Sequence, residues 1–432
     1  MKIYQKSLAE MKKIVADYTS QTVDMKIEKA VSDILRNVQQ YGDQALRNYE
    51  RKFDKIDLSS FQVSSEKIDQ AYQKISPELR AALELAKKNI SSFHQMEIDQ
   101  GFIDGNVPGI IRGQKLTPLN RVGLYIPGGT AAYPSTIMMS AIPAKIAGVK
   151  EIVMVTPPQK DGISSAVLAA AKIAGVSTIF QVGGAQAIAA LAYGTESIPK
   201  VDKIIGPGNI FVATAKKQVF GTVSIDMVAG PSEIGILADR HADPGEIAAD
   251  LLSQAEHDKR ARAMLITNDN NFAKAVDQEV QKQLTTLPRK EIASVAIENR
   301  SFIAVMDNIP DMFELMNDVA PEHLEVQLPD AIQYLGAIKN AGSVFLGKYA
   351  SEPLGDYVAG PNHVLPTGGT AKFSSPLGVY DFVKRTQFIQ FDKQALQSDL
   401  TAITTLARTE GLEAHARAVE SRFKKSCGNK SR

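Results

Sequence analysis

Four of the six histidines lie close to carboxylates in the second half of the chain, and they are the residues best suited to chemistry. They are His257, His323, His363 and His415. His257 follows Gln254 by three positions in a segment with a helical pattern, so both side chains fall on one helical face and form a workable pair of metal ligands. Taken alone, this pair is also compatible with ordinary polar residues on a surface helix.

Glu322 and His323 stand next to each other after Pro321, and proline is common in the first turn of a helix. A histidine near its ordinary pKa of about 6.5 is a natural general base at neutral pH. Adjacent side chains on a regular helix diverge, so the pair cooperates only if the turn is irregular. The alternative is a surface helix cap that happens to contain Glu and His.

Asp356 and His363 lie in a segment rich in Gly and Pro, and Glu410 and His415 lie near the C-terminus. The segment 352–376 is a long loop, of the length that proteins usually keep for function. Loop residues are better functional candidates than the same residues on a helix. However, Asp after Gly is also a common turn former, and a lone terminal His is usually exposed or packed.

Cys427 is the single cysteine of the chain and lies in a polar, basic tail. One cysteine excludes an intramolecular disulfide and any thiolate-rich zinc or iron–sulfur site. The ligands of a metal would therefore be His, Asp, Glu or an amide oxygen, and such a set suits Zn²⁺. Cys427 is also a poor candidate for a nucleophile that adds to a carbonyl.

The segment 121–230 alternates short apolar runs with Ala-rich helical patterns, which predicts a parallel sheet with crossover helices. The expected strands are Val122–Ile126, Ile152–Val155, Thr178–Val182 and Lys203–Ile205. Each run ends in Gly or Pro, and these turns gather at the carboxyl edge of the sheet, where α/β proteins bind ligands. None of the turns matches G-x-G-x-x-G, so the usual dinucleotide fingerprint is absent.

A second α/β pattern occupies 231–376, and helical patterns flank the two α/β segments. The expected elements are strands at Ile234–Leu237, Ala263–Thr267, Ser301–Met306 and Ser343–Leu346, and helices over 24–50, 66–95 and 244–257. The last residues, 377–432, are expected to be helical and are too few to make a strong core alone.

The chain carries 49 Lys and Arg against 48 Asp and Glu, so its charge gives no reason to expect a nucleic-acid or membrane-surface partner. No apolar run approaches the roughly 18–20 residues that a membrane span needs. No secretory signal pattern is visible at the N-terminus. We therefore expect a cytoplasmic enzyme.

Nine short segments, taken together and in chain order, resemble histidinol dehydrogenases. They are Tyr125–Gly129, Gln181–Gln186, Gly206–Asn209, Ala229–Glu233, Gln254–His257, Ala320–Leu324, Gly355–Tyr357, Asn362–Thr367 and Glu410–His415. Each segment alone is weakly specific, whereas the ordered set is highly specific and runs from about 120 to 415. None of the matched positions departs from the pattern of the family.

The resemblance implies the oxidation of L-histidinol through L-histidinal to L-histidine, the last steps of histidine biosynthesis, with two NAD. It implies one Zn²⁺ per subunit, held by Gln254, His257, Asp356 and His415. Glu322 and His323 would be the acid–base pair. The residues that would contact substrate are Ser232, Gln254, His257, His323, Asp356, His363, Glu410 and His415, and those that would contact NAD are Tyr125, Gln186 and Asn209.

The resemblance also implies a fold of two incomplete Rossmann-like domains with parallel-rich sheets, and a homodimer. The NAD-binding domain would be 121–230, and the domain with the zinc and acid–base residues would be 231–376. Part of the mainly helical region 1–120 would complete the second domain. The helical tail, 377–432, would pack on the partner subunit, so that each site is completed across the interface.

Two other classes of protein fit parts of the pattern. A zinc hydrolase could use the same ligands with Glu322 as the base for a metal-bound water, but it would have no use for the glycine turns at 127, 183 and 206. A non-catalytic, two-lobed binding protein would need a cleft but no acid–base pair. The ordered set of segments favours the dehydrogenase.

Overall fold

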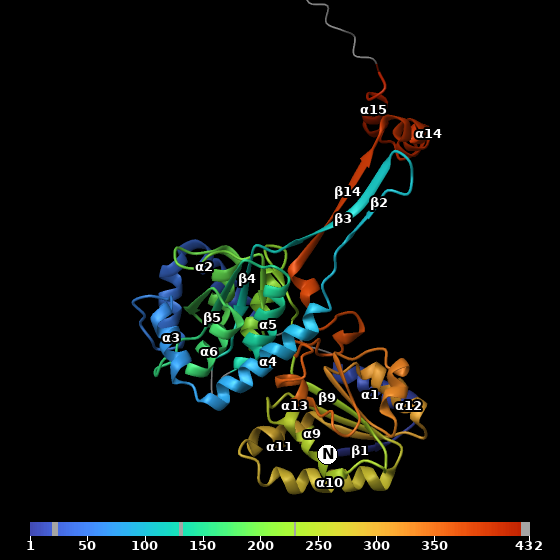
Figure 1. Ribbon diagram of the computed structural model, residues 1–432. Helices are drawn as coiled ribbons and strands as arrows, with labels where there is room; N and C mark the ends of the chain where they lie inside the picture. The colour runs from blue at the N-terminus through green and yellow to red at the C-terminus, as the bar shows by residue number, and fades with distance from the viewer. Residues whose placement is uncertain (20–24, 129–132, 229, 425–432) are drawn as a thin grey trace, which may run out of the picture. The chain divides into compact units, whose positions relative to one another are not determined.

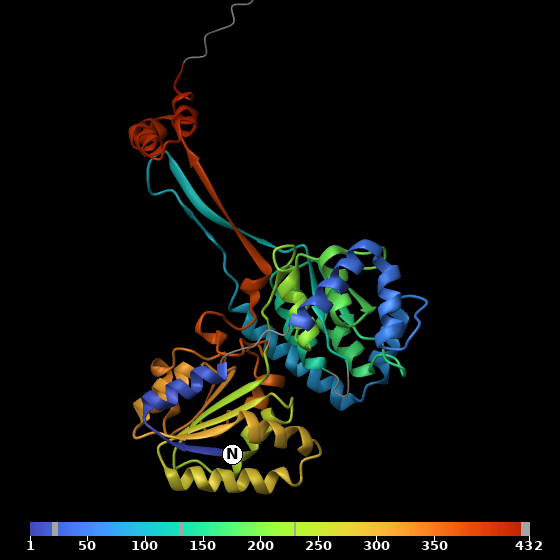
Figure 2. The same cartoon turned by 180° about the vertical axis from the view of Figure 1, so that it is seen from behind.

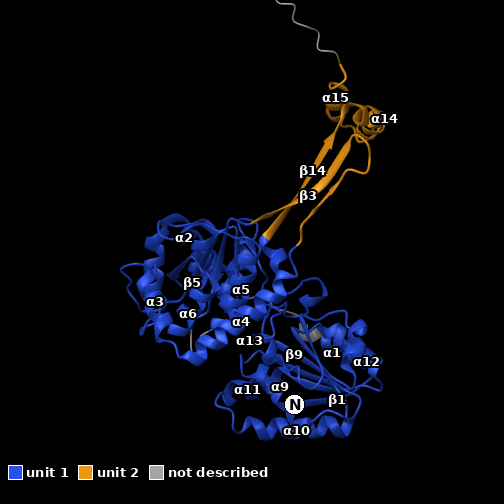
Figure 3. Cartoon of the chain, in the orientation of Figure 1, with its two compact units in different colours: residues 1–98, 119–382 blue, residues 99–118, 383–432 orange. Residues whose placement is uncertain are grey.

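The computed structural model describes residues 1–19, 25–128, 133–228 and 230–424. The chain forms two compact units, of which unit 1 comprises residues 1–98 and 119–382 and unit 2 comprises residues 99–118 and 383–432 (Figure 3). Unit 1 contains two sheets, each in its own α/β lobe. No helix among the described residues is long and apolar enough to cross a membrane.

The first lobe has a wholly parallel sheet in the order β6-β5-β4-β7-β8 (Figure 1). Its strands are β4 (Arg121–Tyr125), β5 (Glu151–Thr156), β6 (Thr178–Gln181), β7 (Lys203–Ile205) and β8 (Ser224–Ile225). Its crossover helices are α5 (Pro134–Ile146), α6 (Ser165–Ala174), α7 (Gly184–Tyr193) and α8 (Ile210–Val219). The four strands expected in this segment are confirmed, because each apolar run lies buried between two helical layers.

N-terminal helices complete both faces of the first lobe. They are α2 (Met25–Phe53), α3 (Ser65–Lys74) and α4 (Pro77–Gln95). The apolar stripe Val31, Ile34, Leu35 and Val38 of α2 is buried in the same core as α7 and α8, as its spacing predicts. Residues 66–95, expected to be helical, form the two helices α3 and α4. Pro77 disfavours helical geometry at Ser76, and the Ser76 hydroxyl caps α4 by accepting the Leu79 N–H.

The second lobe has a parallel sheet in the order β1-β11-β10-β9-β12-β13. Its strands are β1 (Lys2–Gln5), β9 (Glu233–Ala238), β10 (Arg262–Thr267), β11 (Phe302–Val305), β12 (His323–Gln327) and β13 (Ser343–Leu346). Its α-helices are α1 (Leu8–Thr19), α9 (Pro244–Ala255), α10 (Asn270–Leu284), α11 (Lys290–Arg300), α12 (Ile309–Val319) and α13 (Glu352–Tyr357), and short 3₁₀ helices lie at Ala331–Ala337, Thr370–Lys372 and Val379–Phe382. The blue strand β1 forms the edge of this sheet beside β11, a strand that comes about 300 residues later (Figures 1 and 2).

The two lobes share one strand order apart from the added β1. In each, the first strand of the lobe lies between the second and the fourth, so the chain reverses direction across the sheet beside that strand. The reversal falls between β4 and β7 in the first lobe and between β9 and β12 in the second. In open α/β sheets, ligands bind outside the carboxyl ends of the strands at such a reversal.

The helix start expected at Pro321 is wrong. Helix α12 ends at Val319, Ala320 adopts a left-handed conformation with φ of 49°, and β12 begins at His323. Leu324 and Val326 then alternate into the core of the sheet, and this burial outweighs the local preference of Pro321 for a first helical turn. Glu322 and His323 therefore stand at the amino end of a central strand rather than on a helix cap.

Unit 2 joins two distant parts of the chain in an antiparallel sheet. Its strands are β2 (Phe102–Asp104), β3 (Ile110–Pro118) and β14 (Val383–Phe391), and its helices are α14 (Lys393–Thr409) and α15 (Glu413–Glu420). The expectation that 377–432 is helical throughout is wrong, because β14 pairs with β3 over nine residues. Its β-branched and aromatic side chains, such as Thr386 and Phe388, favour a strand, but the partner strand lies some 270 residues earlier in the sequence.

Candidate active site

Residues from four elements meet at the amino edge of the second sheet. His323 begins β12, and the neighbouring parallel strand β9 begins with Glu233. Helix α9 runs back from the carboxyl edge, so its last turn brings Gln254 to the amino edge. Helix α13 contributes Glu352 and Asp356. The candidate site thus lies at the edge opposite to the one where ligands of α/β sheets usually bind.

The ring of His323 is buried, and its Nδ1 atom lies 3.2 Å from the main-chain oxygen of Glu233. Because a carbonyl oxygen only accepts, Nδ1 carries the proton and Nε2 keeps its lone pair. Among the described residues, Nε2 has no hydrogen-bond partner; it lies 3.8 Å from Glu352 Oε1 and 3.9 Å from Asp356 Oδ1. Burial lowers the pKa of His323 to about 4, so the imidazole is neutral at neutral pH and Nε2 can accept a proton.

The carboxyl of Glu322 is also buried and lies beside His323. Its Oε2 accepts the main-chain N–H of Glu233 at 3.0 Å and is 3.8 Å from His323 Nδ1. Burial raises the pKa of Glu322 well above its ordinary value, and the neighbouring carboxylates of Glu233, Asp356 and Glu352 raise it further. A carboxyl with a raised pKa is a stronger base in its ionised form and suits a group that exchanges protons with a substrate.

A buried ion pair supports the two side chains from behind. Arg262 Nη1 lies 2.9 Å from Glu233 Oε1, and Gly368 N–H donates to Glu233 Oε2 at 3.0 Å. The side chain of Glu233 is thereby fixed while its main chain bonds both Glu322 and His323. In the sequence, this pair appears only as a charged residue at the start of each of two apolar strands, which does not by itself predict a buried pair.

Glu352 is a further carboxylate that the sequence analysis missed, because Ser351-Glu352-Pro353 reads as an ordinary helix start. Ligand atoms of His323, Glu352 and Asp356 lie within 4.8 Å of one another. Burial and the charge of Asp356 raise the pKa of Glu352 to about 8. Burial acts to raise the pKa of Asp356. The hydrogen bond and the charge of His363, whose Nδ1 lies 3.5 Å from Asp356 Oδ1, outweigh this effect and lower the pKa.

Several buried polar atoms at this edge have no hydrogen-bond partner among the described residues. They are both amide atoms of Gln254, Nε2 of His323 and Oε1 of Glu352. A buried polar atom without a partner costs about 1–3 kcal/mol, so such a group indicates that a ligand belongs there. The donors are oxygen and imidazole nitrogen, and this set fits Zn²⁺. His257 is exposed, yet it is near enough to influence the pKa of Asp356 and of His323.

The structure therefore gathers most of the expected zinc, acid–base and substrate residues in the second lobe. Ser232 directly precedes β9 and is partly exposed. Glu410 and His415 belong to unit 2, where both are exposed, and their participation in the site stays a prediction.

The residues expected to contact NAD lie at the carboxyl edge of the first sheet. Tyr125 ends β4, and its hydroxyl accepts the Gly184 N–H at 3.2 Å. Gln186 lies in the first turn of α7 and is buried. Asn209 is exposed and caps α8, with its Oδ1 accepting the N–H groups of Phe211 and Val212. This edge includes the reversal point between β4 and β7.

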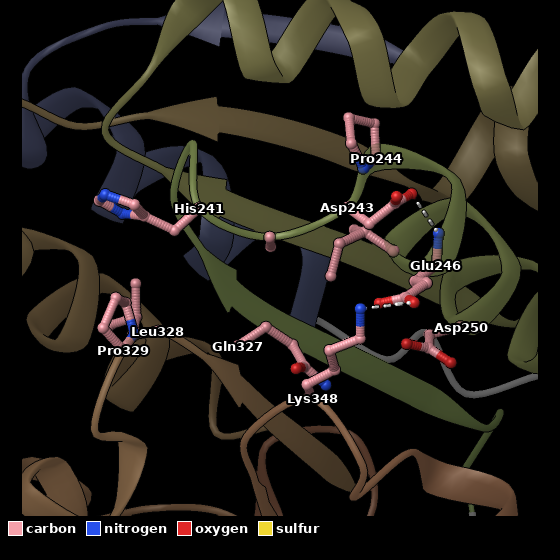
Figure 4. A pocket seen from close by; sticks show the side chains of 11 residues that line it. His241, Asp243, Pro244, Glu246, Asp250, Gln327, Leu328, Pro329 and Lys348 are labelled. Carbon is pink, nitrogen blue, oxygen red and sulfur yellow. Dashed lines mark hydrogen bonds and ion pairs between the residues drawn. The ribbon is translucent and has the colours of Figure 1, made fainter.

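A separate cavity of about 430 Å³ lies at the carboxyl edge of the second sheet (Figure 4). It is lined by residues at the carboxyl ends of β9, β12 and β13 and in α9, among them His241, Asp250, Gln327 and Lys348. Lys348 Nζ forms an ion pair with Glu246 Oε1 at 3.0 Å. The lining residues that the structure describes include none of the residues expected in the active site, so this cavity is not the candidate active site.

Two parallel α/β lobes, one of which holds a buried imidazole among carboxyl groups, place the protein in the class of two-lobed α/β proteins. The profile of the family "Histidinol dehydrogenase" matches residues 18–423. The chain belongs to the histidinol dehydrogenase family.

Three relatives illustrate the match. The histidinol dehydrogenase of Lactiplantibacillus plantarum is 68% identical over 98% of this chain and 99% of its own length. That of Listeria monocytogenes serovar 1/2a is 55% identical over the same shares. The crystal structure of histidinol dehydrogenase from Elizabethkingia anophelis superposes with a TM-score of 0.92 at 39% identity and covers 98% of each chain.

Proposed function

We propose that the protein oxidises L-histidinol through L-histidinal to L-histidine. Membership of the family and the names of its relatives support the substrate. The observation that carries the chemistry is the buried, neutral His323, whose Nε2 lies 3.8 Å from the carboxyl of Glu352 and 3.9 Å from that of Asp356. Such a group can take the hydroxyl proton of an alcohol at neutral pH.

Each oxidation removes a proton from oxygen and a hydride from carbon. Tyr125, Gln186 and Asn209 would hold NAD⁺, which would supply the acceptor of the hydride. His323 Nε2 takes the proton of the alcohol, while its Nδ1–H stays bonded to the main chain of Glu233. This bond keeps the ring in one tautomer and one orientation, so the proton has a single acceptor.

The aldehyde step needs an added nucleophile before a second hydride can leave. We propose water, with Glu322 taking its proton, because a carboxylate whose pKa is raised by burial is a stronger base than an exposed one. Cys427 lies outside the described residues and, on its sequence surroundings, stays a poor alternative. The water oxygen bonds to the aldehyde carbon as its proton goes to Glu322, and the resulting hydrate anion then loses hydride to NAD⁺, which leaves the carboxylic acid.

The proposed zinc ligands are Gln254, His257, Asp356 and, from the partner subunit, His415. Zn²⁺ would supply a Lewis acid at these residues, where the nitrogen groups of the substrate would be bound. The buried amide of Gln254 without a partner supports this assignment from the side of the protein. Glu352 adds a carboxylate beside these residues, and Ser253 Oγ orients it at 3.2 Å.

The proposal includes a homodimer, supported by the surface of unit 2. Its buried residues, among those described, are only Gly113, Ala395, Thr404, Ala407 and Ala416. Large apolar side chains are exposed instead, with Ile103 at 76%, Ile389 at 73% and Leu406 at 65%. Exposed apolar surface of this kind marks an interaction site, and a second copy of the chain is the partner that the family resemblance implies.

The proposal is tested by following NADH formation from L-histidinol with and without a chelator. We expect two NADH for each L-histidine, loss of turnover on chelation and recovery on addition of Zn²⁺. A stoichiometry of one NADH with release of the aldehyde would contradict the second step. No NADH at all from metal-loaded protein would contradict the dehydrogenase and favour a hydrolase.

A further inference from the structure

A buried carboxylate in the first lobe reaches across to the expected NAD site. Glu50 lies in α2, is 1% exposed, and its Oε1 accepts the Gln186 Nε2–H at 3.2 Å and the Gly183 N–H at 3.5 Å. Both donors lie more than 130 residues further along the chain. The carboxyl of Asp54 lies within hydrogen-bonding reach of Glu50 when one of the two holds a proton.

The bond to Glu50 decides which end of the Gln186 amide is free. Since Nε2 donates to Glu50, the amide oxygen is the group left for another partner. That oxygen lies over Gly184, where an added Cβ atom would come within 2.7 Å of it. Gly184 has φ of +62°, and its N–H donates to the Tyr125 hydroxyl. Glu50, Gln186, the Gly183–Gly184 turn and Tyr125 thus form one hydrogen-bonded cluster at the start of α7.

We propose that Glu50 is a positioning residue for the dinucleotide. Its carboxyl accepts a hydrogen bond from the Gln186 amide and so holds the amide oxygen towards a hydroxyl or amide donor of NAD. This inference rests on the proposed function, because it takes Gln186 and Tyr125 as contacts of NAD. The Gly183 N–H bond to the same carboxyl fixes the start of α7, so the turn and the amide are set together.

The surroundings of Glu50 indicate that its role is that of a neutral acceptor. Burial raises the pKa of Glu50 to about 8; the Gln186 bond opposes this shift and the carboxylate of Asp54 reinforces it. At neutral pH the carboxyl therefore holds a proton, and its carbonyl oxygen receives the two N–H groups. Glutamine at this position would offer the same neutral oxygen, whereas methionine would keep the volume and offer none.

The experiment measures NADH binding by fluorescence titration of the full-length protein without substrate. We expect Glu50→Gln to bind within about twofold of the wild-type affinity and Glu50→Met to bind about tenfold more weakly, because two buried donors lose their acceptor. The apparent affinity for L-histidinol should stay unchanged in both. Asp33→Asn, an exposed change on the same helix, is the control and should bind NADH normally.

Wild-type affinity in Glu50→Met would overturn the proposal, and so would an equal loss in Glu50→Gln and Glu50→Met, because charge would then be the required property. If circular dichroism finds Glu50→Met unfolded, Gly184→Ala supplies the test, since its methyl group displaces the Gln186 oxygen. Normal NADH binding in a folded Gly184→Ala variant would overturn the proposal as well. Failure of the proposed function is distinct, because the wild-type protein itself would then neither bind nor form NADH.

Discussion

His323 Nδ1 lies 3.2 Å from the main-chain oxygen of Glu233, so a neighbouring strand fixes which ring nitrogen carries the proton. A main-chain carbonyl cannot change its role with pH, unlike the carboxylate that often orients a catalytic histidine. The main-chain N–H of Glu233 donates to Glu322 Oε2. One residue of β9 thus positions both members of the expected acid–base pair, and the register of β9 with β12 sets their geometry.

His323→Asn should lower the rate of both oxidations about 10²- to 10⁴-fold, the usual contribution of a general base. Because burial lowers the pKa of His323 to about 4, its protonation should not limit the wild-type rate until the pH approaches that value. A pH–rate profile of kcat/KM checks this. An acidic limb that is the same in the variant and the wild type would assign the base to another group.

The same lowered pKa predicts a change in stability with pH. Between pH 6.5 and about pH 4 the unfolded chain binds a proton at this position and the folded chain does not, so stability falls as the pH falls through this window. Relative to His323→Asn, the metal-free wild-type protein should lose about 2 kcal/mol of unfolding free energy between pH 7 and pH 5. Urea denaturation at the two pH values measures the difference. Parallel losses in the two proteins would contradict the buried neutral state.

Glu322→Gln should impair the aldehyde step more than the alcohol step, by about 10²-fold, because the amide cannot take a proton from water. The amide oxygen can still accept the Glu233 N–H, so the fold of the site should persist. Single-turnover measurements that start from L-histidinol and from L-histidinal separate the two steps. Equal losses in both would argue against this division of roles.

Much of the fold follows from local sequence, and the exceptions share a cause. Strands such as Ile152–Val155 are buried apolar runs, and their sequence is sufficient to predict them. β14 depends on β3, a partner far along the chain, and β12 overrides the helix signal of Pro321. Local patterns cannot supply these pairings, because tertiary packing decides them.

The candidate site was predicted for a different reason. The expected zinc and acid–base residues come from an ordered set of family segments, whereas no local pattern predicts a role for Glu233, Arg262 or Glu352. These three act through burial and strand order, which bring the amino ends of β9, β10 and β12 together. Nothing in their local sequence distinguishes a buried ion pair from two solvated charges.

Arg262→Met should destabilise the protein by about 3–5 kcal/mol, because it leaves the Glu233 carboxylate buried without its partner. Adding Glu233→Gln should recover part of this loss, since the second charge is then removed. Arg36→Met breaks an exposed ion pair with Asp33 and should cost at most about 1 kcal/mol. Chemical denaturation gives all three values. A loss in Arg262→Met no larger than in Arg36→Met would show that the buried pair contributes little.

Gln254→Leu should leave the metal-free protein as stable as the wild type or more stable, because it removes two buried polar atoms without partners in the described chain. It should also abolish the rise in Tm that Zn²⁺ gives the wild-type protein. Gln283→Leu, which breaks a bond to the Gly245 carbonyl away from the site, should lower Tm but keep the Zn²⁺ response. A full Zn²⁺ response in Gln254→Leu would remove this residue from the ligand set.

The last prediction concerns His415, which lies in α15 of unit 2, where it is exposed. Unit 2 buries few side chains of its own, and the family resemblance assigns its tail to the partner subunit. If so, a mixed dimer of His323→Ala and His415→Ala chains contains one site with His323 and the partner's tail both intact, and one site with both defects. Each homodimer should be nearly inactive, while refolding equal amounts together should restore roughly a quarter of the wild-type activity, since half of the dimers are mixed and each has one working site. No recovery in dimers confirmed as mixed by mass spectrometry would place His415 in the site of its own chain.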